Sequence, residues 1–259
     1  LQGKLPESKN VADPIIVHPE IRKNLMFMKS VNDGIRGLML KAGNAFDIID
    51  ADQTSKLAKT SENLIALLTP ILKSFATDKA LEITNNALQI YGGHGYITDH
   101  GMEQLVRDAR ILPIYEGTNG IQALDLIGRK FNIHDGQIIN DYLSEIEEFL
   151  IANDDDQNML KFIKLFKSSF IDLKDCVDFI RQIDTKNTKE INAHAMDFLN
   201  IFALVAVGYT WLQFIKVSQD KIKEKNDHFY LSKIQLGEFF MTKVIFETKR
   251  FKNNIYSSG

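Results

Sequence analysis

The apolar residues of this chain recur mostly every three or four positions, the spacing that places them along one side of an α-helix. No stretch alternates between apolar and polar residues as a half-buried strand would. The sequence therefore predicts an all-α protein. The predicted helices cover about residues 19–50, 61–91, 101–111, 118–130, 138–152, 157–183, 188–220 and 228–255.

Residues that start, bend or end helices support this division. Pro19 suits the first turn of the first helix, whereas Pro70, inside the second, is expected to kink it. The predicted breaks fall at turn-forming residues, namely Asp52, Thr54, Ser55, Gly92, Gly93, Gly95 and Pro113.

A change in the sequence pattern near residue 131 predicts two helical units. Residues 1–17 form an irregular lead-in, and residues 18–131 form the first helical domain. Asn132, Asp135 and Gly136 supply a connector. Residues 132–259 form an appended helical domain, read as a second bundle of four helical patterns.

The most apolar run, residues 198–217, nearly reaches the length that spans a membrane. Asn200, Gln213 and Lys216 interrupt it, and amphipathic segments flank it. We therefore expect a central helix of the bundle and no membrane span.

Composition narrows the possible partners. The net charge of −3 gives no electrostatic reason to expect nucleic acid or an anionic membrane surface. The single cysteine, Cys176, excludes an internal disulfide and fits a reducing compartment, so we expect a cytoplasmic protein. The six histidines show no metal-ligand spacing, and we expect no metal.

The segment "QIYGGHGY", residues 89–96, has two interpretations. One glycine is explained by a helix C-cap, because glycine adopts the left-handed conformation at little cost. Three glycines within four positions also suit a backbone that a ligand approaches closely. No strand precedes the segment, so a Rossmann site is not expected. His94 is interpreted as a polar turn residue.

The charges Arg107, Asp108 and Arg110 predict surface or inter-helix ion pairs, which are individually weak. Glu116, in "ILPIYEGTNGIQ", has two interpretations. An acid near a helix start is favoured by the helix dipole. A carboxylate beside an apolar run would instead have a raised pKa and serve as a base once substrate excludes water.

The longer stretch "QIYGGHGYITDHGMEQLVRDARILPIYEGTNGIQ" resembles the C-terminal helical domain of the acyl-CoA dehydrogenases. Its Gln-x-x-Gly-Gly-x-Gly-Tyr, Arg-Asp-Ala-Arg and Tyr-Glu-Gly-Thr elements stand in the family's order and spacing. The resemblance covers about residues 15–130. The segments "IIVHPEIRKNL" and "NGIQALDLIGRK" and the extra helices are similar to the subgroup that includes 3-methylmercaptopropionyl-CoA dehydrogenase, which carries an appended helical domain.

The resemblance implies an FAD-dependent α,β-dehydrogenation of an acyl-CoA, in which Glu116 removes the α-proton while a hydride passes to flavin N5. Tyr115 and Gly117 would lie beside the substrate, and a neighbouring backbone N–H would bind the thioester carbonyl. The implied FAD-contacting residues are Gln89, Gly92 and Gly93, which meet the adenosine-diphosphate part held mainly by a partner subunit, then Thr118, Asn119 and Gly120 after the base, and His18.

One departure from the family pattern and two elements expected before residue 1 stand out. Gly120 replaces the glutamine of many relatives, which removes a side-chain contact. Gln2 and Gly3 resemble the end of an FAD-contacting arginine element whose arginine would precede residue 1. Relatives place a helical domain and a β-domain before this segment, so the chain alone is expected to be inactive.

The resemblance also implies partners: acyl-CoA, a second copy of the chain in a homodimer or larger assembly, and an electron acceptor such as an electron-transfer flavoprotein. Two alternatives stay open from the sequence. The chain could be a non-catalytic assembly module of the same fold, or part of an acyl-CoA oxidase.

Overall fold

The computed structural model describes residues 4–5, 7–184, 186–224 and 227–257, which form helices and no strand, as predicted. The first part contains η1 (Ile15–Val17), α1 (Pro19–Ala51), α2 (Lys56–Tyr91), α3 (Gly93–Tyr96), η2 (Thr98–His100), α4 (Met102–Ile111), α5 (Asn119–Leu124), η3 (Asp125–Arg129) and η4 (Lys130–Gly136). The second contains α6 (Gln137–Ala152), α7 (Leu160–Gln182), α8 (Thr188–Ala193), α9 (Ala195–Glu224), α10 (His228–Phe239), η5 (Phe240–Val244), η6 (Ile245–Glu247) and α11 (Thr248–Ser257).

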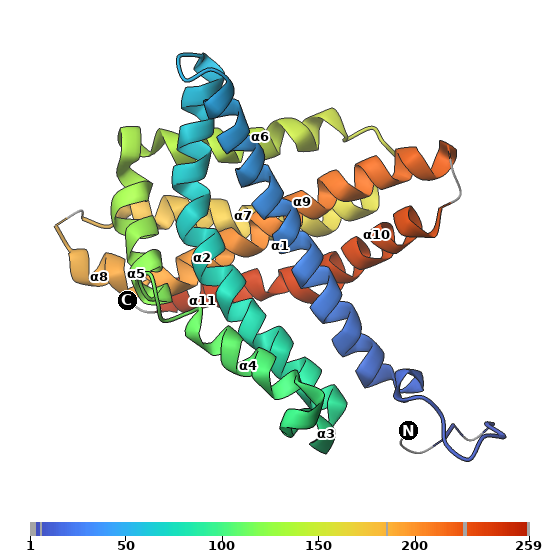
Figure 1. Ribbon diagram of the computed structural model, residues 1–259. Helices are drawn as coiled ribbons and strands as arrows, with labels where there is room; N and C mark the ends of the chain where they lie inside the picture. Colours follow the sequence, from blue (N-terminus) through green and yellow to red (C-terminus); the bar gives the residue numbers. More distant parts are fainter. Residues whose placement is uncertain (1–3, 6, 185, 225–226, 258–259) are drawn as a thin grey trace.

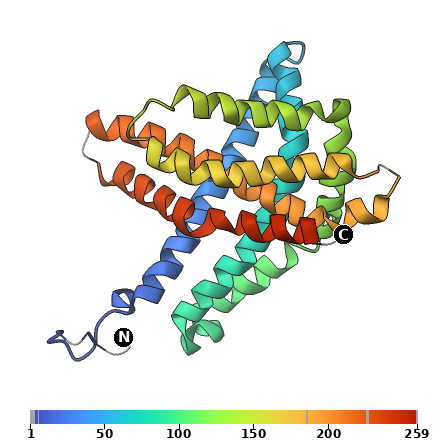
Figure 2. The ribbon, with the colours of Figure 1, turned by 180° about the vertical axis from the view of Figure 1, so that it is seen from behind.

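The helices pack in two layers that cross steeply. The long helices α1 and α2 run side by side and antiparallel, and α4 packs against α2 (Figure 1). Seen from behind, α6, α7 and α11 lie across them (Figure 2). The ends of α2, α3 and α4 extend beyond the second layer, which leaves that end of the first layer uncovered.

Most predicted helices are confirmed, and their ends follow from local chemistry. α2 begins earlier than predicted because the Ser55 hydroxyl accepts a hydrogen bond from the Ala58 N–H at 3.0 Å, which caps the helix. α2 continues through Pro70. It ends at Gly92, whose φ is 62°, but Gly93 then begins one more helical turn, so the glycines do not simply stop the chain.

Three predicted helices are each divided in the structure. The helix predicted over 118–130 changes from α5 to the π-turn η3 at Asp125. The helix predicted over 188–220 breaks at His194 into α8 and α9. The helix predicted over 228–255 is interrupted by the π-turn η5 and the 3-10 turn η6 between α10 and α11. Helical periodicity continues across such short interruptions, so the apolar pattern alone does not reveal them.

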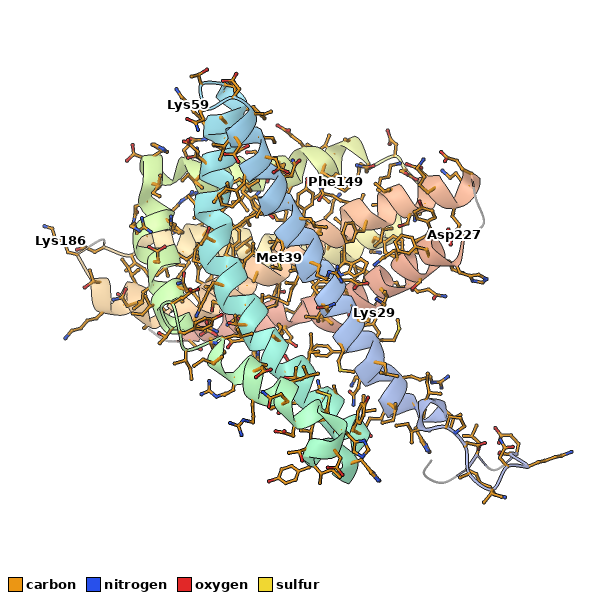
Figure 3. The ribbon with its side chains drawn as sticks, in the orientation of Figure 1. Lys29, Met39, Lys59, Phe149, Lys186 and Asp227 are labelled. Atoms are coloured by element: carbon orange, nitrogen blue, oxygen red, sulfur yellow. The ribbon has the colours of Figure 1, made fainter. Side chains whose placement is uncertain are left out.

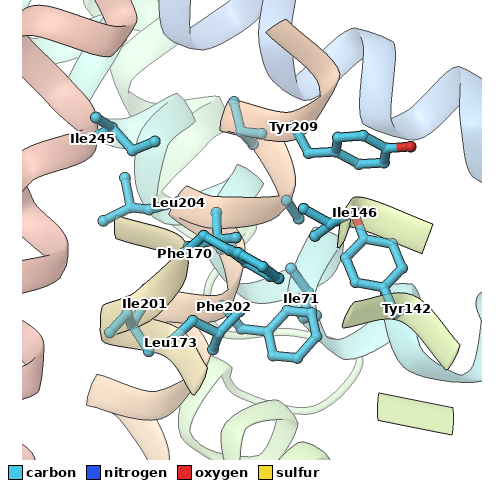
Figure 4. Packing of buried hydrophobic residues seen from close by; sticks show 14 of the residues in the cluster. Ile71, Tyr142, Ile146, Phe170, Leu173, Ile201, Phe202, Leu204, Tyr209 and Ile245 are labelled. Carbon is cyan, nitrogen blue, oxygen red and sulfur yellow. The ribbon is translucent and has the colours of Figure 1, made fainter. Parts of the chain in front are cut away.

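The predicted central helix is confirmed as α9, whose residues 198–212 except Asn200 are all buried. By length and composition α9 could cross a membrane, but 83% of its most apolar window is buried inside the protein. Ile201, Phe202 and Leu204 of α9 meet Ile71 of α2 and Phe170 of α7 in one hydrophobic cluster (Figure 4).

This cluster contains side chains from both sides of the predicted boundary at residues 131 and 132, so the two units share a core. The boundary itself stays a prediction.

The crossing of α1 over α9 depends on two glycines of α1. A Cβ at Gly34 would lie 2.6 Å from Trp211 Nε1 and 2.6 Å from Val207 Cγ1, and one at Gly37 would lie 2.4 Å from Phe214 Cζ. Trp211 Nε1 also donates to the Ser30 carbonyl at 3.1 Å, which satisfies the buried indole. Glycine therefore lets the two helices approach closely.

A polar contact joins the same two helices to α6. Glu145 accepts from the Tyr209 hydroxyl at 3.0 Å and from Lys41 Nζ at 2.5 Å. Burial and the charge of Glu145 raise the pKa of Tyr209 above its ordinary value, so the hydroxyl remains a donor. One carboxylate thus links α1, α6 and α9.

Replacing Gly34 by alanine should lower the free energy of unfolding by about 1–3 kcal/mol, because the new methyl group overpacks the contact with Trp211. Gly43 of the same helix has nothing within 4 Å of its Cβ position. Gly43→Ala should therefore raise stability by about 0.5–1 kcal/mol through helix propensity. Urea unfolding of both variants checks this, and equal stabilisation by both would contradict the close crossing.

Candidate active site

The loop between α4 and α5 holds Glu116 in an unusual backbone conformation. Its φ is 52°, and that of Gly117 is 84°. A non-glycine residue in this left-handed region costs roughly 1–2 kcal/mol. The Asn119 N–H closes the loop by donating to the Pro113 carbonyl at 3.1 Å. The surrounding structure therefore holds Glu116 in a position that its own conformational preference disfavours.

The side chain of Asn119 attaches this loop to the middle of α2. Asn119 is only 7% exposed. Its Nδ2 donates to Asp78 Oδ1 at 2.7 Å and to the Ser74 carbonyl at 3.0 Å. Burial raises the pKa of Asp78 despite the hydrogen bond from Asn119. Asn119 was predicted as a cofactor contact, but its amide is occupied within the chain.

Lys73 of α2 secures the other side of the loop. Its Nζ donates to the Gly117 carbonyl at 2.5 Å and to Asn119 Oδ1 at 3.0 Å. Sequence analysis missed this residue, because a lysine on a helix surface carries no signal of a partner 44 positions away. Thr118 caps α5 by accepting from the Ile121 N–H at 3.3 Å.

Glu116 itself is exposed, and so are the apolar residues beside it. Ile111, Ile114 and Tyr115 are 49%, 47% and 46% exposed. The apolar pocket expected around the carboxylate is therefore not formed by this chain, because its hydrophobic neighbours face outward with it. Covered by another molecule, the same residues would supply apolar surface next to a carboxylate.

A hollow of about 590 Å³ lies beside the loop, between the end of α1, the start of α2 and α5. Gln122 lines it and donates from Nε2 to the Glu116 carbonyl at 3.4 Å. Phe46 and Ile121, which also line it, are 54% and 56% exposed. Exposed apolar side chains thus stand on α1 and α5 as well as on the Glu116 loop.

The other residues predicted to contact FAD gather elsewhere. Because α1 and α2 are antiparallel (Figure 1), His18 before α1 lies at the same end as the last turn of α2, which contains Gln89 and is followed by Gly92 and Gly93. Gln89 stands 11 positions beyond Asp78, which amounts to about 17 Å along a helix. The predicted residues therefore form two groups, one beside the middle of α2 and one at its end, and not a single cluster.

The group at the end of α2 leaves part of its backbone accessible to a ligand. Gln89 and Gly93 are exposed, and a Cβ at Gly93 would meet nothing within 4 Å. Gly95, in contrast, is required internally, because its Cβ would lie 2.8 Å from the Leu88 carbonyl oxygen. Gly120 is also exposed, beside the loop. Gln2 and Gly3 lie outside the described residues.

In the part of the chain that the structure describes, Arg107, Asp108 and Arg110 form no close ion pair, although the charge of Arg110 favours ionisation of Asp78 on α2. No salt bridge there includes them, and Asp108 accepts instead from Gln104 Nε2 of the same helix at 2.7 Å. Among these described residues, no group of three or more His, Cys, Asp and Glu side chains could hold a metal ion.

Two family descriptions match successive parts of the chain. Residues 7–131 match "Acyl-CoA dehydrogenase, C-terminal domain", and residues 142–258 match "Acetyl-CoA dehydrogenase C-terminal like".

The relatives agree with these matches. 3-Methylmercaptopropionyl-CoA dehydrogenase of Ruegeria pomeroyi is 42% identical over 46% of this chain and 20% of its own length. Butyryl-CoA dehydrogenase of Syntrophomonas wolfei is 27% identical over 92% of this chain and 41% of its own length. The chain thus spans about two-fifths or less of the length of these relatives.

The fold agrees as well. The structure of an acyl-CoA dehydrogenase complexed with FAD from Bacillus anthracis superimposes with a TM-score of 0.76, at 17% identity, over 96% of this chain and 44% of that one. The matches to both halves, the relatives and the fold lead to the same conclusion: this chain belongs to the acyl-CoA dehydrogenase family.

Proposed function

We propose that the chain is the C-terminal part of an FAD-dependent enzyme that dehydrogenates an acyl-CoA thioester, with Glu116 as the base that removes the α-proton. The observation that carries this proposal is the Glu116 loop. An exposed carboxylate is held at positive φ by Lys73 and Asn119, in the segment where the family resemblance places its base. Strained residues that the surroundings hold in place occur preferentially at functional sites.

The chemistry of each part follows from its position. Glu116 is a compact acceptor, and it becomes an effective base when bound substrate removes water from it. Ile114 and Tyr115 would then form apolar surface against the acyl thioester. The N–H of Gly117, next to the base, would hydrogen-bond the thioester carbonyl and stabilise the negative charge that develops there. FAD, when bound, accepts the hydride.

FAD would contact two groups of residues. Gln89, Gly92 and Gly93, with His18 at the same end, would meet its adenosine-diphosphate part, and Thr118 and Gly120 would meet it near the base. Because the side chain of Asn119 is bonded to α2, we assign it the positioning of the loop, with only its backbone left for the cofactor. Gly120 offers no side-chain contact.

Assembly with a second copy of the chain is supported by apolar side chains at the uncovered end of the first layer. Tyr91 of α2, Tyr96 of α3 and Leu105 of α4 are 55%, 77% and 52% exposed. Exposed apolar side chains that gather at one end of a molecule commonly mark a protein interface. The full enzyme would pass its electrons to an acceptor such as an electron-transfer flavoprotein.

A cytoplasmic location is supported by Cys176, the only cysteine, which is buried and free. Burial raises the pKa of its thiol to about 12, so it is unreactive. Cell fractionation tests the location, and recovery in a secreted fraction would contradict it.

Glu116→Gln in the FAD-loaded enzyme should slow flavin reduction by butyryl-CoA or 3-methylmercaptopropionyl-CoA about 10²–10⁴-fold, the range of a lost general base. Stopped-flow bleaching of the flavin measures this rate. Glu103→Gln, which removes a carboxylate from α4, should leave it unchanged. Normal reduction in the Glu116 variant would refute the assignment, and rapid peroxide formation during turnover would favour an oxidase.

Asn119→Ala should lower the free energy of unfolding by about 1–3 kcal/mol, because the buried partners on α2 lose their hydrogen bonds. Asn85→Ala, at an exposed position of α2, should be neutral or slightly stabilising. Thermal or urea unfolding compares the two. If Asn119→Ala kept full stability while FAD affinity fell, the residue would be a direct cofactor contact instead.

Leu105→Asp should shift the protein towards the monomer mass of 29.5 kDa in sedimentation equilibrium, because it places a charge among the exposed apolar side chains of α2, α3 and α4. Ile171→Asp is the matched control, because Ile171 lies on the opposite layer in α7 and is similarly exposed at 54%. This variant should keep the mass of the unsubstituted protein. A mass of 29.5 kDa for the unsubstituted chain at every concentration would exclude the proposed dimer.

A further inference from the structure

A second hollow opens at the edge of the crossing between α1 and α9, where α10 lies beside both. Its volume is about 560 Å³, within the range of small-molecule sites. Lys29 marks the α1 side of this edge (Figure 3). None of its lining residues belongs to the Glu116 loop or to the end of α2, so the site is separate from the proposed active site.

Basic side chains dominate the polar part of this hollow. Asp33, whose side chain is 8% exposed, accepts from Lys233 Nζ at 2.7 Å and from Lys29 Nζ at 3.1 Å. Burial opposes ionisation of Asp33, but the two lysines more than offset it and hold its pKa below the usual value. One carboxylate is therefore shared between two cations.

Arg36, one turn further along α1, adds a third cation to the same hollow. No ion pair in the described part of the chain includes its guanidinium. The lining thus carries three positive side chains and one negative side chain. An anion would balance this excess, whereas a cation would find its only acidic partner already occupied.

Much of the rest of the lining is apolar and faces solvent, and Ser218 and Tyr230 line the hollow as well. Leu40, Val217 and Phe229 are 72%, 57% and 58% exposed, and Phe214 forms the floor against α1. Lys233 Nζ lies 5.2 Å from the centre of the Phe229 ring, which places the charge directly beside the aromatic surface. A molecule that covers these side chains would remove apolar area from water.

We propose that this hollow binds a small amphiphilic anion, with an aromatic or aliphatic body on Phe214, Val217 and Phe229 and a carboxylate or phosphate beside Arg36 and Lys233. A purely apolar ligand would leave the positive charges unbalanced, and a small inorganic anion would leave the apolar walls in water. Since the site joins α10 to α1, occupancy would also stabilise the contact between the two layers.

Isothermal titration of the chain with naphthyl compounds of different headgroup tests the proposal. 1-Naphthyl phosphate and 1-naphthoate should bind at least tenfold more tightly than 1-naphthalenemethanol, and 1-naphthylmethylammonium should bind weakest. Affinity for the anions should fall as salt is raised. Decanoate and decanol repeat the comparison with an aliphatic body, and inorganic phosphate alone should not bind.

Variants locate the site. Arg36→Gln should weaken binding of 1-naphthyl phosphate about 5–10-fold, as expected for a charge-assisted contact, and leave binding of the alcohol unchanged. Val217→Asp, which puts a carboxylate against the ligand, should abolish anion binding. Arg22→Gln, at an exposed position on the same helix, is the matched control.

Trp211 provides a local signal. It is the only tryptophan of the chain, and its ring centre lies 5.6 Å from that of Phe214. Binding should change its fluorescence in the unsubstituted chain and in Arg22→Gln, but not in Val217→Asp, with helix content by circular dichroism equal in all three. Equal affinity for anion and ammonium, or unaltered anion binding by Arg36→Gln, would overturn the proposal.

Discussion

The close approach of α1 to α9 is the constraint on which most of this structure depends. Gly34 and Gly37 leave room for Trp211 and Phe214, and the indole N–H finds its acceptor on the backbone of α1. This contact places the most apolar helix of the chain under the α1–α2 pair. The two segments that match separate family descriptions therefore share one hydrophobic core.

The same arrangement gives α2 a second role as the support of the proposed active site. In the middle of α2, Lys73 donates to the loop and Asp78 accepts from Asn119 of the loop. The far end of α2 carries Gln89 and is followed by Gly92 and Gly93. A continuous helix keeps these two groups at a constant separation of about 17 Å. Stability in the core and geometry at the site are thus connected through one rigid element.

Exposure distinguishes the two proposed sites. Glu116 lies among apolar residues that face outward, so its chemistry requires a substrate and further protein surface to exclude water. The hollow between α1, α9 and α10 is instead completed by this chain alone, with its charges and apolar walls already adjacent. In our proposals the first is therefore one face of a larger site, whereas the lining of the second comes from this chain alone.

The sequence by itself determined the all-α class, the positions of most helices, the burial of most of the 198–217 run and the family. Local rules suffice for these, because helical periodicity, caps and a contiguous motif all lie within short stretches of chain. The roles proposed for Glu116, Gly117 and Thr118 likewise rest on a contiguous motif. Short breaks such as His194, which keep the apolar period, were not found.

Only the tertiary structure decided how those pieces meet. Lys73 and Asn119 are 46 positions apart, and Lys233 and Asp33 are 200 apart, so no local pattern indicates either contact. The sequence also could not predict that this chain forms no dry pocket around Glu116, since an apolar run does not show whether its side chains face inward. Burial and charge pairing depend on which surfaces the folded chain brings together, and that is a property of the three-dimensional packing.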